Sequence, residues 1–229
     1  MRKICKYLFI VVPLLYSCQE NYSAPPYNDY EKKIRKLPVA NEKIIIPKEW
    51  QKMDSLSFLR FKNVTHIIID ADSIPNWIVN FKKTETIYSQ FGKIKSIPSN
   101  IDKLNQLRYI TFFSHSINNI PETICKLQRL EYLSLWNNNI SNIPDCLCTL
   151  TGLKIINLIG NKLTEIPEEI DDLRNIEKLY LDGNQISELP ENIYNLPKLK
   201  EISLSGNPLK NRDEIRKRFK KKNIKVVLD

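Results

Sequence analysis

The side chains best suited to catalysis or metal binding are few and widely separated in this sequence. Its two histidines, His66 and His115, do not stand in the H-E-x-x-H spacing of zinc hydrolases or in a similar arrangement. The chain contains no G-x-S-x-G nucleophile motif and no glycine-rich phosphate loop, and its carboxylates are scattered. The sequence therefore predicts a protein that is not an enzyme and that holds no metal and no cofactor.

The formal net charge of +9 is concentrated at one end of the chain. Residues 208–229 contain nine basic and three acidic residues, whereas residues 61–207 contain 15 basic and 17 acidic ones. A nucleic-acid-binding domain usually carries its basic excess on the folded surface itself. We therefore expect no nucleic-acid partner. We interpret the basic segment as a cap, with binding to anionic lipid or glycan as the alternative.

The first residues have the pattern of an export signal. Basic residues at the start are followed by an apolar run of ten residues from Tyr7 to Tyr16. A helix needs roughly 20 apolar residues to cross a bilayer, so this run is too short and is interpreted as a signal peptide over residues 1–17.

The residues at the end of this run resemble a lipoprotein processing site. Leu15, Ser17 and Cys18 are similar to the lipobox of bacterial lipoproteins, although Tyr16 is bulkier than the usual residue. The resemblance implies lipid attachment at Cys18 and a bacterial envelope location, with the outer membrane expected. Plain secretion and an uncleaved anchor remain alternatives. Residues 18–45 are expected to form a tether.

An internal repeat of 23 residues organises the rest of the chain, because prolines recur at that interval together with apolar columns. Alternation around each L-x-L predicts a short strand, and each proline suits the first turn of a helical segment. Stacked units can bury apolar columns that a single unit cannot, so the pattern predicts a solenoid. The prolines are Pro75, Pro98, Pro121, Pro144, Pro167 and Pro190.

From Leu130 one unit reads L-x-x-L-x-L-x-x-N-x-I-x-x-I-P-x-x-L-x-x-L, which resembles the short class of the leucine-rich repeat family. The resemblance implies an α/β solenoid with parallel strands on the concave face and short helical segments on the convex face. We expect an irregular N-terminal capping repeat over 46–60, where Ile46-Pro47 recurs, then repeats over 61–207. A basic C-terminal cap over 208–229 should cover the last core layer with Ile215 and Phe219.

A column of asparagines accompanies the repeat at Asn138, Asn161, Asn184 and Asn207, and earlier units hold Ile69, Gly92 and His115 there. Amides can pair with buried loop backbone as donor and acceptor, so we predict a hydrogen-bond ladder. The preceding position is glycine in later units and Asn137 in this one, which predicts a positive φ.

Cys125 and Cys148 occupy the same position in neighbouring units, whereas Cys146 stands outside this column. Export permits a disulfide between Cys125 and Cys148 if their Cα atoms approach within about 7 Å. Wider spacing of units on the convex side is the argument against it. The C-x-C pair alone is too small for a zinc site.

Outward-facing strand positions place apolar side chains together on the middle units. Strands lie about 4.8 Å apart, so these side chains form one surface. Exposed apolar patches with Trp and Tyr are commonly interaction sites, although a terminal segment such as 19–45 is an alternative occupant. The candidate partner-binding residues are Tyr88, Tyr109, Phe113, Tyr132, Trp136, Ile155, Ile159 and Tyr180.

These patterns predict a non-enzymatic recognition module that binds a protein or peptide on its concave face. Carbohydrate binding on the same aromatic surface is one alternative, because aromatic rings also stack on sugars. Self-association of a structural envelope lipoprotein is the other.

Overall fold

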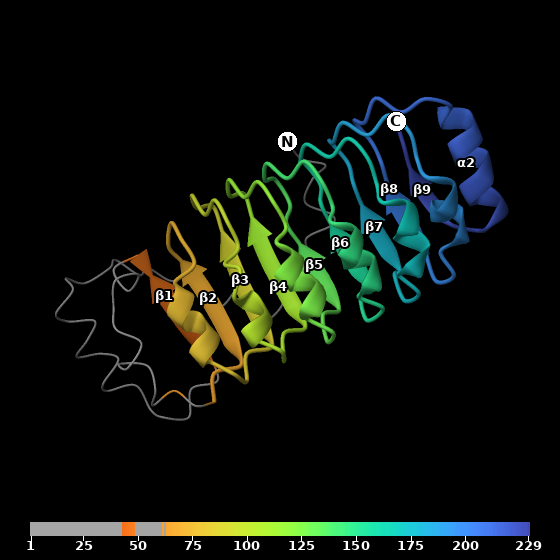
Figure 1. The fold of residues 1–229 in the computed structure, drawn as a ribbon. Coiled ribbons are helices and arrows are strands. Elements are labelled where there is room, and N and C mark those ends of the chain that lie inside the picture. Colours follow the sequence, from red (N-terminus) through yellow and green to blue (C-terminus); the bar gives the residue numbers. More distant parts are fainter. Residues whose placement is uncertain (1–42, 49–60, 62) are drawn as a thin grey trace. The chain divides into compact units, whose positions relative to one another are not determined.

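The computed structural model describes residues 43–48, 61 and 63–229 (Figure 1). The expected signal peptide, Cys18, most of the tether and most of the capping repeat 46–60 lie outside these residues. No helix among the described residues has the length and apolar character that crossing a bilayer requires.

The described residues form one parallel sheet of nine strands whose spatial order follows the chain (Figure 1). This arrangement confirms the predicted solenoid. The strands are β1 (Lys43–Pro47), β2 (His66–Asp70), β3 (Thr86–Gln90), β4 (Tyr109–Phe113), β5 (Tyr132–Ser134), β6 (Ile155–Asn157), β7 (Lys178–Tyr180), β8 (Glu201–Ser203) and β9 (Lys225–Val227).

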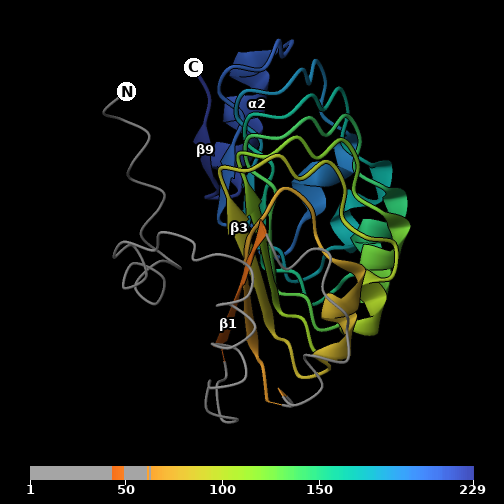
Figure 2. The ribbon, with the colours of Figure 1, turned by 90° about the vertical axis from the view of Figure 1, so that its left-hand side faces the viewer.

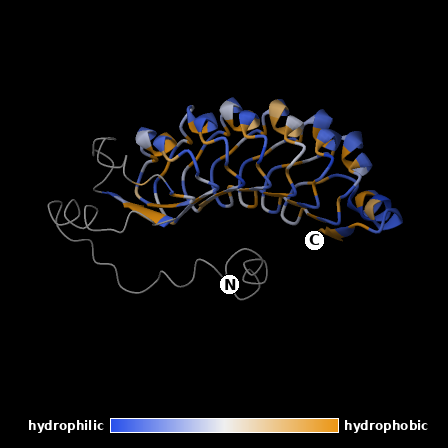
Figure 3. Ribbon diagram, turned by 90° about the horizontal axis from the view of Figure 1, so that it is seen from below, coloured by the Kyte–Doolittle hydropathy of each residue, from blue (hydrophilic) through white to orange (hydrophobic). Residues whose placement is uncertain are grey.

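Strand alternation divides the sheet into a core face and an open face. Ile110 and Phe112 of β4 are fully buried, whereas Tyr109, Thr111 and Phe113 between them are half-buried. The sheet lines the concave side of the solenoid and the helical segments line the convex side (Figures 2 and 3). The core lies between these two layers.

Each convex segment is a short 3₁₀-helix that begins after a proline in five of the six units. Pro121 precedes η7 with φ −70°, and Pro144 precedes η8 with φ −66°. The fixed φ of proline suits this entry, as predicted. The segments are η5 (Asn76–Asn80), η6 (Ile101–Lys103), η7 (Glu122–Lys126), η8 (Asp145–Thr149), η9 (Glu168–Asp172) and η10 (Glu191–Asn195).

The unit that begins with β2 is shorter than the others. His66 pairs with Thr86, 20 residues later, whereas Thr86 pairs with Tyr109, 23 residues later. Ile69 is therefore opposite Ser89 inside the strands, and its assignment to the asparagine column was wrong. The residues missing from this unit lie between β2 and Pro75.

The N-terminal edge also differs from the sequence-based expectation. Ile46-Pro47 was expected before a helical segment, and Lys48 directly after it is in a 3₁₀-helix. Both Ile46 and Pro47 also belong to β1, which pairs with β2 along its whole length. The sheet therefore begins at Lys43, inside the segment expected to be tether. Proline is tolerated here because β1 ends at Pro47.

The C-terminal cap consists of α2 (Arg212–Lys221) followed by β9. Ile215 is 5% exposed and Phe219 is fully buried, which confirms that both cover the last core layer. The ring of Phe219 lies 4.8 Å from the ring of Tyr194 in η10. The guanidinium of Arg218 stacks on the Tyr194 ring, 3.6 Å from its centroid, and Arg218 pairs with Glu191.

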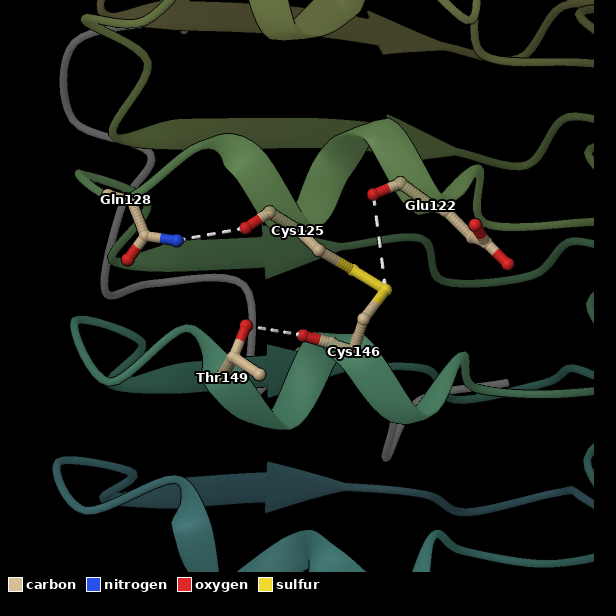
Figure 4. Close-up of a disulfide and its surroundings, with 5 residues drawn as sticks. All are labelled: Glu122, Cys125, Gln128, Cys146 and Thr149. Carbon is tan, nitrogen blue, oxygen red and sulfur yellow. Dashed lines mark hydrogen bonds between the residues drawn. A yellow bond between two sulfur atoms is a disulfide. The ribbon is translucent and has the colours of Figure 1, made fainter.

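The disulfide joins Cys125 to Cys146, so the expected bridge to Cys148 was wrong (Figure 4). Residues two apart on a 3₁₀-helix point in different directions. The Cys146 sulfur points to the preceding unit, 3.9 Å from the carbonyl oxygen of Glu122, whereas Cys148 is buried as a free thiol. The Cα atoms of the bridged pair are 5.7 Å apart, within the permitted range.

Candidate functional site

The asparagine ladder fixes the turn that follows each strand of the concave face. The Oδ1 of Asn161 accepts a hydrogen bond from the N–H of Ile140 at 3.0 Å. Its Nδ2 donates to the carbonyl oxygens of Leu135 at 2.9 Å and Leu158 at 3.0 Å. The same pattern recurs at Asn138, Asn184 and Asn207, which confirms the predicted ladder.

The residue before the ladder position adopts the left-handed conformation in every unit from β3 onward. Asn137 has φ 56°, as predicted from its alignment with Gly160, Gly183 and Gly206. Its Nδ2 also donates to Ser114 Oγ at 2.8 Å, so this asparagine joins two neighbouring turns. Phe91 stands in the same column with φ 52° and was missed by the sequence analysis.

Three aromatic rings from consecutive units form a continuous row at the carboxyl ends of the strands. We call Phe91, Phe113 and Trp136 the aromatic row. The Phe113 and Trp136 rings are stacked, with centroids 4.4 Å apart and planes 22° apart. Phe91 meets Phe113 edge-on at 4.8 Å. The row therefore crosses from β3 to the turn after β5.

Tyrosine and aliphatic residues that were predicted for binding lie on the same open face of the sheet as this row. Tyr109, Tyr132 and Ile155 are paired in register across β4, β5 and β6, and each is half-buried. Ile159 stands at the position of Trp136 in the next unit, and its carbonyl oxygen accepts from the N–H of Asn137 at 2.8 Å. Burial raises the pKa of the Tyr132 phenol. Six of the eight predicted residues thus lie on the open face of β4, β5 and β6 or just after these strands. Tyr109, Tyr132 and Ile155 are separated from the aromatic row by the register row Thr111, Ser134 and Asn157.

The other two predicted residues, Tyr88 and Tyr180, hold their hydroxyl groups in hydrogen bonds. Tyr88, in the middle of β3, is paired with Thr111 of β4, and its hydroxyl donates to Gln90 of the same strand. Tyr180 is only 8% exposed, and its hydroxyl donates to Glu201 Oε2 at 3.3 Å. Tyr180 therefore has little surface to offer a partner in this conformation.

Charges of alternating sign border the amino-terminal edge of the concave face. Glu131 accepts from Arg108 at 2.5 Å and from Lys154 at 2.6 Å, and these hydrogen bonds and charges lower the pKa of its carboxyl against the opposing effect of burial. Because each charge has a neighbour of opposite sign, this edge is close to neutral. The column was visible in the sequence as alternating signs at one position: Glu85, Arg108, Glu131, Lys154, Glu177 and Lys200.

His115 replaces asparagine in the ladder and lies against Gly92. A Cβ atom at Gly92 would be 2.7 Å from His115 Cε1, so the two residues fit only as a pair. His115 is 7% exposed, and its ring nitrogens make no hydrogen bonds within the described part of the chain. Burial lowers the pKa of His115, and the nearby backbone of Ser89 and Gly92 offsets this only in part. These features indicate a structural histidine, as predicted.

Acidic, thiol and imidazole side chains form no metal-binding group in the part of the chain that the structure describes. Among residues 43–48, 61 and 63–229, no group of three or more could hold a metal ion. Burial, with nearby carboxylates, raises the pKa of the Cys148 thiol to about 12. Such a thiol is unreactive at neutral pH.

Comparison with known families identifies the repeats. Residues 128–186 match the family model described as Leucine rich repeat, and residues 174–215 match the model described as Leucine Rich repeats (2 copies). A comparison with curated protein sequences found no significant match.

Solved structures share the fold over most of this chain. The leucine-rich repeat ectodomain of the plant receptor kinase GASSHO1/SCHENGEN3 from Arabidopsis thaliana, in complex with CASPARIAN STRIP INTEGRITY FACTOR 2, is 27% identical with a TM-score of 0.60, over 67% of this chain and 20% of that chain. An internalin from Listeria monocytogenes is 22% identical with a TM-score of 0.66, over 76% of this chain and 50% of that one.

A leucine-rich repeat protein of Leptospira interrogans is 21% identical with a TM-score of 0.57, over 75% of this chain and 56% of that one. At these identities the two bacterial structures show the fold alone. The chain spans between 20% and 56% of the length of these three proteins.

Proposed function

Because this chain belongs to the leucine-rich repeat family, we propose that it is a non-enzymatic recognition module that binds a protein or peptide on its concave face. The plant ectodomain, which was solved with a bound partner, offers a precedent for interaction on this fold. Fold alone does not define a ligand, so the proposal depends on the surface of this particular chain.

The aromatic row is the observation that carries the proposal. Scaffold side chains of this fold point into the core, yet Phe113 and Trp136 stack on each other on the opposite side of the sheet. Tyr109, Tyr132 and Ile155 form a second, half-buried apolar set at the other end of the same strands. Trp and Tyr are the residues that most often anchor protein interfaces.

The ring geometry favours a protein or peptide over a carbohydrate. Sugars stack on open ring faces, but Phe113 and Trp136 cover one face of each other at 4.4 Å. Ile159 occupies the next position of the column beyond Trp136. The row therefore has at least one face of each stacked ring covered, which favours packing of apolar polypeptide side chains over stacking of a sugar.

For location, the proposal is a bacterial envelope protein anchored through a lipid at Cys18, with the outer membrane as its site. Its support is the lipobox-like sequence, because Cys18 lies outside the described residues. The Cys18→Ala variant should be released from membranes on cell fractionation. Retention equal to wild type would contradict lipid anchoring.

The concave-face proposal is tested by recovery of partners from envelope extract, glycans included, on the full-length protein. A Phe113→Ser, Trp136→Ser variant should lose those partners that wild type retains. Ile45→Ser is the matched control, because Ile45 is an exposed apolar residue of the same sheet, on β1. Equal recovery by the double variant would remove the aromatic row from the function. Partners that are glycans would support the carbohydrate alternative.

Self-association is separated from these outcomes by sedimentation. If the surface bound a second copy, the mass would rise with protein concentration and the Phe113→Ser, Trp136→Ser variant would remain monomeric. A mass that does not change with concentration supports a heterologous partner.

A further inference from the structure

Phe91 combines two features that are both unfavourable in the free protein. Its φ of 52° is the left-handed conformation, which is strained for a bulky side chain. Its side chain is also 69% exposed, the higher value of the two exposed large apolar residues in the described part of the chain. Units beyond β4 place Asn137, Gly160, Gly183 and Gly206 at this position.

The core does not explain Phe91. Its only ring contact with a described residue is the edge of Phe113 at 4.8 Å, so it extends the aromatic row outward onto the rim of turns. Strain together with exposure, at the end of a row of aromatic rings, points to a residue kept for a contact that the free protein does not make.

A hollow lies a few residues along the chain from Phe91, between the segment after β2 and the segment after β3. Its volume is about 380 Å³, and its lining comes from residues 72–76 and 93–98, with Phe91 outside it. Lys93, two residues beyond Phe91, is part of its lining. Polar residues dominate the wall: Asp72, Ser73, Asn76, Lys93, Lys95 and Ser96.

The hollow has an excess of positive charge. Lys93 and Lys95 are both exposed, and neither has an ion-pair partner among the described residues. The carboxylate of Asp72 already lies 3.4 Å from Lys48 Nζ. Asp70, which ends β2, alternates with buried Ile69 on the open face of the sheet and does not line the hollow.

We propose that Phe91 and this hollow form one recognition element, for a polypeptide segment that presents an apolar side chain followed by an acidic one. The apolar side chain packs on Phe91 and Phe113, and the acidic one enters the hollow between Lys93 and Lys95. This assignment rests on the proposed function and deepens it, because it extends the binding surface from the strands to the rim and fixes the chemistry of the partner.

The test uses a phage-displayed library of random dodecapeptides, selected on the full-length protein. Synthetic copies of enriched peptides are measured by fluorescence anisotropy against wild type, Phe91→Gly, a Lys93→Glu, Lys95→Glu variant and Trp136→Ser. Lys162→Glu is the matched charge control, because Lys162 stands at the position of Lys93 three units later, away from the hollow.

Enriched peptides should carry an apolar residue followed by Asp or Glu. Phe91→Gly should weaken their binding by about tenfold or more. Its thermal midpoint should equal or exceed that of wild type, because glycine accepts the left-handed conformation. The Lys93→Glu, Lys95→Glu variant should also bind more weakly, by a factor that shrinks with salt, and Lys162→Glu should bind normally.

Each other outcome contradicts a defined part of the proposal. If no peptide depends on Trp136, the proposed function and this inference both fail. If peptides depend on Trp136 but bind Phe91→Gly as well as wild type, the function stands and this inference fails. If they depend on Phe91 but lack acidic residues and ignore both lysines, the acidic partner is wrong.

Discussion

At the scale of single residues, the asparagine ladder shows how one amide joins two neighbouring units. Asn161 accepts from Ile140 in one unit and donates to Leu135 in that unit and to Leu158 in its own. All of these groups are buried. Loss of the amide would leave a backbone N–H and two carbonyl oxygens without this partner, which is more costly than losing a solvated contact.

We therefore expect Asn161→Ala to lower the free energy of unfolding by about 1–3 kcal/mol in urea denaturation. Asn139→Ala is the control, because Asn139 follows a ladder residue but no hydrogen bond of its side chain is observed among the described residues. Its effect should stay within about 0.5 kcal/mol. Equal losses in the two variants would mean that the ladder contributes nothing specific.

The ladder and the left-handed turn at Asn137 could be predicted because both depend on residue types with a known preference, repeated at a fixed interval. Phe91 could not be predicted in this way, because phenylalanine favours neither a turn nor a positive φ. Only its place in the 23-residue repeat, two units before Asn137 and three before Gly160, indicated a positive φ. A residue whose type differs from the types at the same repeat position, as Phe91 does, is the most informative about function in this sequence.

His115 should make stability depend on pH in one direction. Burial lowers its pKa in the folded protein, whereas the unfolded imidazole takes up a proton near pH 6.5. Below that pH the unfolded state binds more protons, so stability falls as pH drops from about 6.5 toward the lower folded pKa and then levels off.

We expect His115→Asn to remove this decline between about pH 7 and pH 5, since an amide does not titrate there. The measurement is the urea midpoint at several pH values in both proteins. Gly92 is kept in both proteins. The close contacts of a Cβ atom at Gly92 would be with the imidazole of His115, which the variant lacks, so glycine fits beside either residue. An identical decline in the variant would assign the pH dependence to other groups.

At the scale of elements, the strands followed from alternation and the helical segments from the prolines. The shortened unit that begins with β2 could not be predicted, because the interval from Pro75 to Pro98 stays at 23 residues. The deletion precedes Pro75 and shortens only the distance from β2 to that proline. The disulfide was also assigned wrongly, because equal position in two units was treated as proximity, whereas direction around the 3₁₀-helix decides which sulfur reaches the other.

The disulfide between η7 and η8 should stabilise the fold measurably. It links residues separated by 21 positions, and a bridge over a loop of this size contributes about 3 kcal/mol by restricting the unfolded chain. Cys146→Ser should therefore lower the urea midpoint and abolish the bridge in mass spectrometry. Cys148→Ser should retain the bridge. If Cys148→Ser instead removed the bridge, the observed pairing would be incorrect.

At the scale of the whole molecule, each unit packs mainly on its two neighbours, so stability is a sum of units and junctions. The sequence predicted the C-terminal cap from two apolar residues one helical turn apart, because an open last layer would expose the core. It did not predict that β9 would add a final strand beside β8, since K-V-V is too short to be distinguished from a loop. The cap and the aromatic row lie in different units, so the row can be altered without opening the core.

This arrangement predicts local rather than global damage when the cap is weakened. Phe219 is fully buried against Tyr194, so Phe219→Ala should cost about 3–5 kcal/mol at the C-terminal junction. Hydrogen exchange should then show lost protection in β8 and β9, while amides of β3 and β4 remain protected and binding at the aromatic row persists. Leu133→Ala, which removes a core side chain of β5, is the control and should lower protection on both sides of the middle units. A uniform loss in Phe219→Ala would show that the solenoid unfolds as one cooperative body, and that the recognition surface depends on a cap that it does not touch.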